Sequence, residues 1–334
     1  MTSPLDVPGA AIEAQPEAVL KGIEHKAIEG RSLGQIAWLR LKRDKVALGG
    51  GVVVILLILA AVLAPLLTKI AGGSPTEFNQ DLIDPTFSKP KGEGLFAGFS
   101  WAHPFGVEPR SGRDVFSRVL YGAQISLLIG FLATLLSVSI GTITGVVAAY
   151  FGGWVDTLIS RSMDVFLAFP LLLFALALAG VIPDSAFGLS GNSLRIAVLV
   201  FIIGFFNWPY IGRIIRGQTL ALREREFVDA SRSLGASGRW VIFRELMPNL
   251  VAPILVYATL MIPTNILFEA ALSFLGVGIR PPTPSWGKML ADAVPFYSVA
   301  PMYMVVPGLA IFITVMAFNL LGDGLRDALD PRAR

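Results

Sequence analysis

The chain has 334 residues, of which 54% are hydrophobic and only 15% are charged, and its mean hydropathy is +0.67. This composition is too apolar for a soluble globular protein and predicts a membrane protein. The net charge of +3 is too small to indicate nucleic-acid binding and fits basic flanks of membrane spans, while the absence of cysteine excludes a disulfide framework and a thiolate site.

Residues 1–34 show no sustained periodicity and contain no apolar core of a signal peptide, so we expect a flexible cytoplasmic tail. Beyond them, six windows carry no charged side chain, and each meets or approaches the roughly 20 residues that cross a bilayer. These windows are residues 46–68, 119–155, 165–183, 196–212, 246–268 and 293–322. The longest is too short for two spans and a turn, so the sequence predicts six transmembrane helices.

Basic residues indicate the orientation of these spans. A basic cluster directly precedes the first window, which places the N-terminus in the cytoplasm, and six spans return the C-terminus to the same side. That cluster is Arg40, Lys42, Arg43 and Lys45. The loop after the fourth window is then also cytoplasmic, and it is rich in arginine. Its arginines are Arg213, Arg216, Arg223, Arg225, Arg232, Arg239 and Arg244. We expect residues 69–118 and 270–292 to be extracytoplasmic.

Proline, small and polar residues inside the windows are expected mainly to pack helices. Four prolines would break a soluble helix, but spans tolerate proline where neighbours satisfy the freed carbonyl groups. They are Pro170, Pro253, Pro263 and Pro307. Small residues in GTITGVVAAY, residues 141–150, favour close helix contact. Polar side chains are expected to form interhelical hydrogen bonds, with lining of a hydrated path as the alternative. These are Gln124, Ser126, Thr142, Thr144, Asn207, Thr264 and Asn265.

The sequence carries no motif for catalysis or metal binding. It has no G-x-x-x-x-G-K-[ST] motif, so we expect it neither to hydrolyse ATP nor to be an enzyme. His25 and His103 lie outside the windows, and His103 has no second histidine or carboxylate at ligand spacing, so no metal or cofactor is expected. The window interiors also lack the ionisable residues of an ion-coupled carrier. Glu269 and Asp164 lie at window edges, where hydration or interhelical pairing explains them.

The segment Glu226–Asn249, EFVDASRSLGASGRWVIFRELMPN, is a charged island between two apolar windows. Phe227, Ala230, Ser231 and Leu234 share one face of a predicted short helix over 227–234. We call residues 226–249 the coupling segment, for a reason given below.

A sharp turn follows that first helix. Gly235 stands where a helix end needs positive φ, and Ser237 stands where a second helix needs an N-cap. Trp240, Phe243 and Met247 form the next apolar stripe, and Pro248 is expected to close it. We therefore predict two short helices that meet at a glycine corner.

The pattern Asp229-Ala230-Ser231, three residues, Gly235 and later Pro248 resembles the EAA coupling loop in membrane subunits of bacterial ABC importers. Asp229 replaces the usual Glu and Ser231 the second Ala, which keeps charge and small size.

Other stretches resemble the subgroup that imports dipeptides, oligopeptides or nickel, specifically its C-type permease with an N-terminal extension. They are HPFG (103–106) with GRDVFSRVLYGAQISLLIG (112–130), EAALSFLGVGIRPPTPSWGKML (269–290) and AFNLLGDGLRDALDPR (317–332), together with RSLGQIAWLRLKRDKVALGG near the N-terminus.

This resemblance implies an all-α polytopic permease of the type I ABC importer fold in the bacterial inner membrane, with both termini cytoplasmic. The implied division is a tail (1–34), a first-span region (35–70), an extracytoplasmic loop (71–118), a five-helix core (119–322) with coupling loop 214–248, and a C-terminal tail (323–334). The implied coupling residues are Glu226, Phe227, Asp229, Ala230, Ser231, Leu234, Gly235, Ala236, Pro248 and Asn249.

The resemblance also implies partners: a homologous second permease in a heterodimer, two ABC ATPase subunits that hydrolyse ATP, and an extracytoplasmic substrate-binding protein. The implied substrate is a di- or oligopeptide, favoured by the breadth of the subgroup, with nickel or another small solute as the alternative. The first outer loop is either a cap that meets an extracytoplasmic partner or a structured connector.

Two other function classes are weighed against this one. A secondary transporter or channel is disfavoured by the missing midplane charges and the lack of an inverted repeat. The coupling segment is alternatively an interfacial amphipathic helix of a membrane scaffold. Dependence of transport on ATP and on a co-expressed ATPase separates these classes. A helix-turn-helix DNA reader is excluded because spans abut the segment on both sides.

Overall fold

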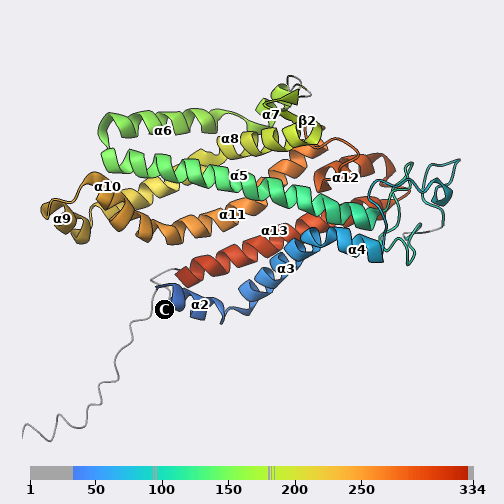
Figure 1. The fold of residues 1–334 in the computed structure, drawn as a ribbon, viewed down its shortest axis with the longest axis horizontal. Helices are drawn as coiled ribbons and strands as arrows, with labels where there is room; N and C mark the ends of the chain where they lie inside the picture. Colours follow the sequence, from blue (N-terminus) through green and yellow to red (C-terminus); the bar gives the residue numbers. More distant parts are fainter. Residues whose placement is uncertain are drawn as a thin grey trace, which may run out of the picture.

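The computed structural model describes residues 33–92, 94, 96–179, 181, 183 and 185–329. Apart from its last two residues, the tail expected over 1–34 lies outside this part of the chain. The long helices lie side by side along the longest axis (Figure 1). The helices are α2 Leu33–Leu41, α3 Lys45–Val62, α4 Ala64–Ile70, α5 Val115–Phe151, α6 Gly153–Ala168, α7 Leu171–Ala179, α8 Gly191–Arg223, α9 Glu226–Ser233, α10 Gly238–Trp240, α11 Met247–Phe274, α12 Trp286–Ala293 and α13 Pro301–Leu329.

Short elements complete the described structure. Two 3₁₀ turns, η1 at Gln80–Leu82 and η3 at Val294–Phe296, lie in loops, and a π-helix, η2 at Val241–Leu246, joins α10 to α11. The strands β1 (Ser185–Ala186) and β2 (Leu189–Ser190) form an antiparallel hairpin before α8.

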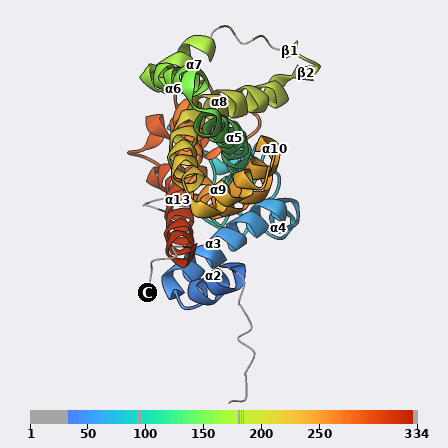
Figure 2. The same ribbon diagram turned by 90° about the vertical axis from the view of Figure 1, so that its left-hand side faces the viewer.

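The long helices form layers (Figures 1 and 2). Helices α6 and α7 lie on one side, α5, α8 and α11 lie in the middle, and α3 packs against α13 on the other side. Glycines let α5 and α8 approach closely. A Cβ atom added to Gly141 would lie 2.7 Å from the Trp208 carbonyl oxygen, and one added to Gly145 would lie 2.6 Å from that of Gly212. The predicted packing role of segment 141–150 is therefore confirmed.

In the part of the chain that the structure describes, five helical stretches are long and apolar enough to span a membrane: Lys45–Val62, Val115–Phe151, Gly191–Arg223, Gly238–Phe274 and Pro301–Leu329. The pair α6 and α7 gives a sixth span if its two helices, bent by 75° from each other, are taken together. The expectation of one continuous helix over 165–183 was therefore wrong. Proline disfavours helical geometry in the residue before it, and Phe169, before Pro170, has extended backbone with φ −77° and ψ 125°.

The other predicted prolines lie inside continuous helices, as expected. Pro253 and Pro263 lie within α11, and Pro307 lies within α13. Helix α13 also continues through the charged residues after 322 to Leu329, because charge alone does not end a helix.

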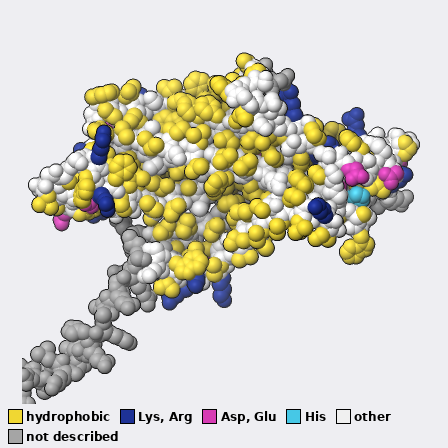
Figure 3. Space-filling model, viewed as in Figure 1, with side chains coloured by type: hydrophobic (Ala, Val, Ile, Leu, Met, Phe, Trp, Pro, Cys, Tyr) yellow, Lys and Arg dark blue, Asp and Glu magenta, His cyan; other side chains and the backbone are white. Residues whose placement is uncertain are grey.

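The surface has the distribution expected of a membrane protein. Hydrophobic side chains cover the middle of the molecule, and charged side chains gather toward its two ends (Figure 3). Helix α3 illustrates this, since Ile55 and Leu56 are 57% and 58% exposed. Such apolar exposure along a helix is stable in lipid rather than in water.

The two ends carry different structures. The coupling segment lies at one end, and the loop that precedes α5 lies at the other, beside α12 (Figure 1). Helix α5 begins at Val115 because the Asp114 carboxylate caps it by accepting from Ser117 N, so the helix starts within the segment expected as a loop to 118.

Candidate functional site

The coupling segment turns sharply at Gly235. Helix α9 ends at Ser233, and Gly235 has φ +83°, the left-handed conformation that glycine tolerates best. Ser237 then caps α10 by accepting a hydrogen bond from Trp240 N at 3.4 Å. The predicted corner and N-cap are both confirmed.

The second predicted helix does not end at Pro248. Helix α10 continues through η2 into α11, so one helical stretch runs over Gly238–Phe274. Pro248 lies in the first turn of α11, where the preceding π-helix bonds Met247 N to Ile242 O rather than to a closer carbonyl. This wider turn accommodates the proline ring. The second half of the coupling segment is therefore continuous with a candidate membrane span.

The apolar residues predicted to share one face of α9 are mostly exposed, with Phe227, Ala230 and Leu234 all at the surface. Val228 is the buried residue, in a cluster with Val241, Leu246 and Ile215. Leu234, by contrast, is 88% exposed. The helical pattern located an apolar face correctly but did not show that this face is left uncovered.

Beside α9, the start of the next helix is also apolar and exposed. Phe227, Trp240 and Phe243 are exposed here, and acidic and basic side chains lie at the same end of the molecule (Figure 3). An exposed apolar patch rimmed by charge is typical of a protein-docking surface.

Several contacts hold this segment on the helix bundle. Ser231 Oγ donates to Glu245 Oε1 at 2.9 Å, across the corner. The Arg232 guanidinium lies 5.6 Å from the centre of the Tyr150 ring. Arg223 donates to the carbonyl oxygen of Ala149 at 2.9 Å, near the end of α5. The Arg232 contact joins the segment to α5, and the packing of Val228 with Ile215 joins it to α8.

Ion pairs join α6 to α8 toward the same end. Asp156 accepts from Arg216 Nε at 2.5 Å and from its Nη2 at 2.6 Å. Asp164 pairs with Arg213, so interhelical pairing explains this window-edge carboxylate, as expected.

Polar side chains inside the spans link the helices to one another. Asn207 Nδ2 donates to Asn265 Oδ1 at 2.9 Å, and Asn265 Nδ2 donates to Thr134 Oγ1 at 2.9 Å. Gln124 Nε2 donates to the Ala61 carbonyl at 2.7 Å. These bonds confirm the expected interhelical role for Gln124, Asn207 and Asn265.

The threonines behave differently from that expectation. Thr144 and Thr264 donate to carbonyls of their own helices, at Ile140 and Leu260. Thr142 Oγ1 is buried and has no hydrogen-bond partner in the described structure. A threonine hydroxyl reaches the carbonyl one turn earlier without any second helix, which is why the interhelical prediction was wrong for Thr144 and Thr264.

Glu269 is completely buried, so hydration does not explain it. Its carboxylate accepts from Ser126 Oγ at 2.8 Å and from Ser273 Oγ at 2.7 Å. Ser126 Oγ in turn accepts from Trp286 N at 3.3 Å. Glu269 thus joins α11, α5 and the start of α12, which confirms interhelical pairing.

A second buried polar cluster, which the sequence analysis missed, fixes the loop before α5. The Glu108 carboxylate pairs with Arg118 and accepts from Tyr303 OH at 3.0 Å. Arg118 also donates to the carbonyl of Pro282 at 3.2 Å. The cluster ties the loop to α5, α13 and the segment before α12. Arg118, a fully charged residue directly before an apolar window, was the sequence feature that could have revealed it.

His103 has a carboxylate partner after all. Its Nδ1 lies 2.9 Å from Asp114 Oδ1, although the two residues are distant in the sequence, so the statement that His103 lacks a carboxylate at ligand spacing was incomplete. Burial raises the pKa of the Asp114 carboxyl above its ordinary value, against hydrogen bonds from Ser117 and His103 that lower it. In the described residues, no group of three His, Cys, Asp or Glu side chains is arranged to hold a metal.

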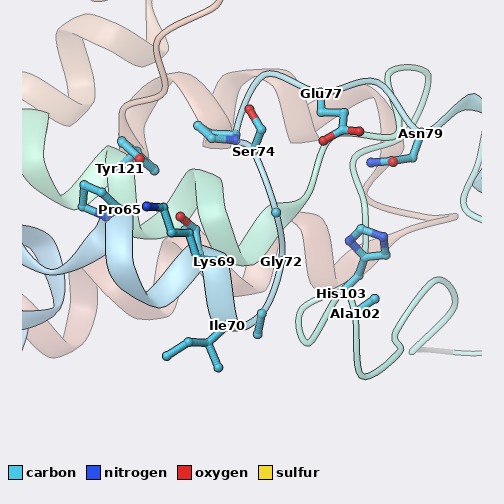
Figure 4. Close-up of a pocket in the computed structure, with 14 residues that line it drawn as sticks. Pro65, Lys69, Ile70, Gly72, Ser74, Glu77, Asn79, Ala102, His103 and Tyr121 are labelled. Carbon is cyan, nitrogen blue, oxygen red and sulfur yellow. The ribbon is translucent and has the colours of Figure 1, made fainter.

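An open cavity of about 600 Å³ lies beside this pair. Lys69 and Tyr121 lie on one side of it, and Glu77, Asn79 and His103 lie on the other (Figure 4). Lys69 and Glu77 give the cavity charges of both signs, at the end of the molecule opposite the coupling segment.

Comparison with known proteins agrees with this architecture. Residues 141–334 match the family described as binding-protein-dependent transport system inner membrane component, and residues 32–90 match the N-terminal TM domain of oligopeptide transport permease C. The chain belongs to this family of membrane permeases of ABC importers, in its peptide-permease group. The resemblance and the fold class inferred from the sequence are confirmed.

Two relatives and one solved structure illustrate the match. The chain is 39% identical over 298 residues to the dipeptide transport system permease protein DppC of Alkalihalophilus pseudofirmus, covering 89% of this chain and 90% of that protein. It is 45% identical over 242 residues to the glutathione transport system permease protein GsiD of Escherichia coli, covering 72% and 76%. An inward-facing structure of the MetNI methionine ABC transporter matches with TM-score 0.50 and 18% identity, covering 64% of this chain and 96% of that chain, which shows the shared fold.

Proposed function

We propose that this permease forms, with a homologous second permease, the path by which an ATP-driven importer carries short peptides across the bacterial inner membrane. The two relatives described above are named for dipeptide and glutathione transport, and glutathione is itself a small peptide. A substrate-binding protein delivers the peptide at the outer face, consistent with a family described as binding-protein-dependent.

The observation that carries the mechanism is the exposed coupling segment, which continues into span α11 without a break. An ATPase subunit docks on the apolar surface around α9 and moves it when nucleotide binds. The docking residues are Glu226, Phe227, Asp229, Ala230, Ser231, Leu234, Gly235, Ala236, Pro248 and Asn249. Because η2 and α11 follow directly, this motion tilts the span and alternates access to the path.

In the proposed orientation, the coupling segment and both termini face the cytoplasm and the loop 71–118 lies outside. Its support is the arginine-rich connector at the coupling end and the location of the loop at the opposite end (Figure 1). Single cysteines test it, because the chain contains none of its own. In intact cells an impermeant maleimide should label Ser88→Cys and not Ser237→Cys, and the reverse pattern overturns the orientation.

Transport is tested in proteoliposomes that hold this chain, its second permease and both ATPase subunits. With the loaded binding protein outside and ATP inside, a radiolabelled dipeptide should accumulate. An ATPase variant that cannot hydrolyse ATP is the control. Uptake that is equal with and without ATP hydrolysis would identify a secondary transporter instead, and the absence of peptide uptake would contradict the peptide assignment.

A further inference from the structure

A small cavity lies at the break between α6 and α7. Its volume is about 290 Å³, and its walls come from the end of α6, the start of α7, α8 and α11. The residues that matter for the argument are Phe166, Phe169, Phe206, Asn207, Tyr210 and Phe268.

Five of the ten residues that line the cavity are aromatic. Phe166 and Phe206 meet edge to face with their centres 5.5 Å apart. The face of an aromatic ring attracts a cation, most strongly where water is partly excluded. Among the described residues that line the cavity, none is acidic or basic, so no protein cation already occupies these rings.

The polar atoms at the cavity are hydrogen-bond acceptors. Asn207 is only 4% exposed, and its Nδ2 already donates a hydrogen bond to Asn265 Oδ1. The described structure supplies no donor to Asn207 Oδ1 or to the Tyr210 hydroxyl, which is free to accept as well as donate.

The helix break adds backbone acceptors. Helix α6 ends here, and the last carbonyls of a helix lack intrahelical donors and carry partial negative charge. Pro170 has no N–H group to satisfy them. Oxygen acceptors and ring faces together, without a full negative charge, suit weak binding of a protonated amine.

Partly exposed charged side chains lie near the break. Asp164 and Arg213, about one turn away on α6 and α8, have side chains that are 48% and 51% exposed. Half-exposed charges within spans face water-filled spaces. Irregular backbone at membrane depth is likewise tolerated only inside protein or along a cavity, and discontinuous helices mark substrate sites in transporters.

We propose that this cavity is a transit subsite for the protonated amino terminus of the peptide substrate. The proposal rests on the peptide-import function above and adds a recognition element within the permease itself. Weak binding is consistent with transit, since a path must let its substrate leave as well as enter.

The test uses the assembled importer in proteoliposomes without the binding protein, so that the partner's selectivity plays no part. The probe is trialanine whose first residue carries a photoreactive diazirine, with either a free or an acetylated amino terminus. After illumination, mass spectrometry maps the labelled residues. The free-amine probe should label residues 166–172 and 206–210, and acetylation should reduce this labelling on the order of threefold to tenfold.

Variants sharpen the result. Phe169 and Tyr210 are 51% and 58% exposed, so Phe169→Leu and Tyr210→Leu should preserve the fold while reducing labelling by the free-amine probe. Phe131→Leu is the matched control, because Phe131 is 55% exposed and lines a separate apolar groove between α3 and α5. It should leave the labelling unchanged.

Three outcomes overturn the subsite: equal labelling by both probes, labelling elsewhere only, or labelling of the break by a photoreactive phospholipid, which would make it a lipid-facing surface. ATP-dependent peptide uptake is measured separately on a second portion of the same vesicles, with the loaded binding protein added outside. If wild-type uptake persists while the subsite test fails, only the subsite is wrong. If wild-type uptake is absent, the proposed function itself fails.

Discussion

Ser231 Oγ donates a hydrogen bond to Glu245 Oε1 at 2.9 Å, which closes the corner between α9 and the helical stretch that becomes α11. The bond links α9 to η2 across the Gly235 corner, so its removal should loosen α9 without unfolding the bundle.

We expect Ser231→Ala to speed amide hydrogen exchange in α9 about twofold to tenfold, which corresponds to the roughly 0.5–1.5 kcal/mol of a typical hydrogen bond. Glu245→Gln keeps an acceptor oxygen and should have a smaller effect. Ser233→Ala, on the exposed side of the same helix, controls for the loss of a hydroxyl. Equal exchange in Ser231→Ala and Ser233→Ala would show that the bond does not restrain α9.

The corner itself depends on backbone conformation rather than on space. No atom lies within 4 Å of a Cβ atom added to Gly235, but its φ is +83°. Gly235→Val should cost about 1–3 kcal/mol through strain alone, misdirecting α9. We expect normal membrane abundance but weak ATPase retention and little uptake. Gly235→Asn is the control, since asparagine tolerates this conformation better than valine. Wild-type uptake by Gly235→Val would exclude a coupling role for this corner.

Local features of the coupling segment were predictable from the sequence. The positive φ of Gly235 and the cap at Ser237 follow from rules that involve only neighbouring residues. The direction of the apolar face did not follow, because helical spacing shows that a face exists and not what covers it. Val228 is buried, while Leu234 is exposed.

The buried polar contacts were less predictable, because they join residues far apart in the chain. Glu269 meets Ser126 across 143 positions, and Tyr303 meets Glu108 across 195. The composition of the chain located the membrane spans, but it could not show which polar residues of different segments contact each other. The effect of proline was also not predictable from the residue type alone. Pro170 separates α6 from α7, whereas the prolines within α11 and α13 leave those helices continuous.

Glu269 is expected to support architecture rather than carry protons. Glu269→Gln retains one acceptor and can donate to a rotated serine hydroxyl, so assembly and uptake should be largely retained. Glu269→Ala leaves Ser126 and Ser273 without their acceptor in a fully buried site and should destabilise the permease by about 2–4 kcal/mol. Thermal unfolding in detergent and uptake in vesicles provide the comparison. Complete loss of uptake by a stably assembled Glu269→Gln variant would indicate an ion-coupling role instead.

The Asp114 carboxyl is expected to make the stability of the protein depend on pH. Burial raises its pKa in the folded protein above the ordinary value of 3.8, so folding penalises the charged form. Its contribution to stability is therefore fully present below pH 3.8 and is lost as pH rises through the raised pKa.

Asp114→Asn keeps an N-cap acceptor for Ser117 N but cannot ionise. The stability of the wild type relative to this variant should therefore fall as pH increases from the ordinary carboxyl value toward neutrality. Thermal unfolding of both proteins across that range measures the difference, with Asp84→Asn, another turn-capping aspartate of the same loop, as the control. A difference that stays flat with pH, or rises with it, would show that the contact with His103 outweighs the cost of burial.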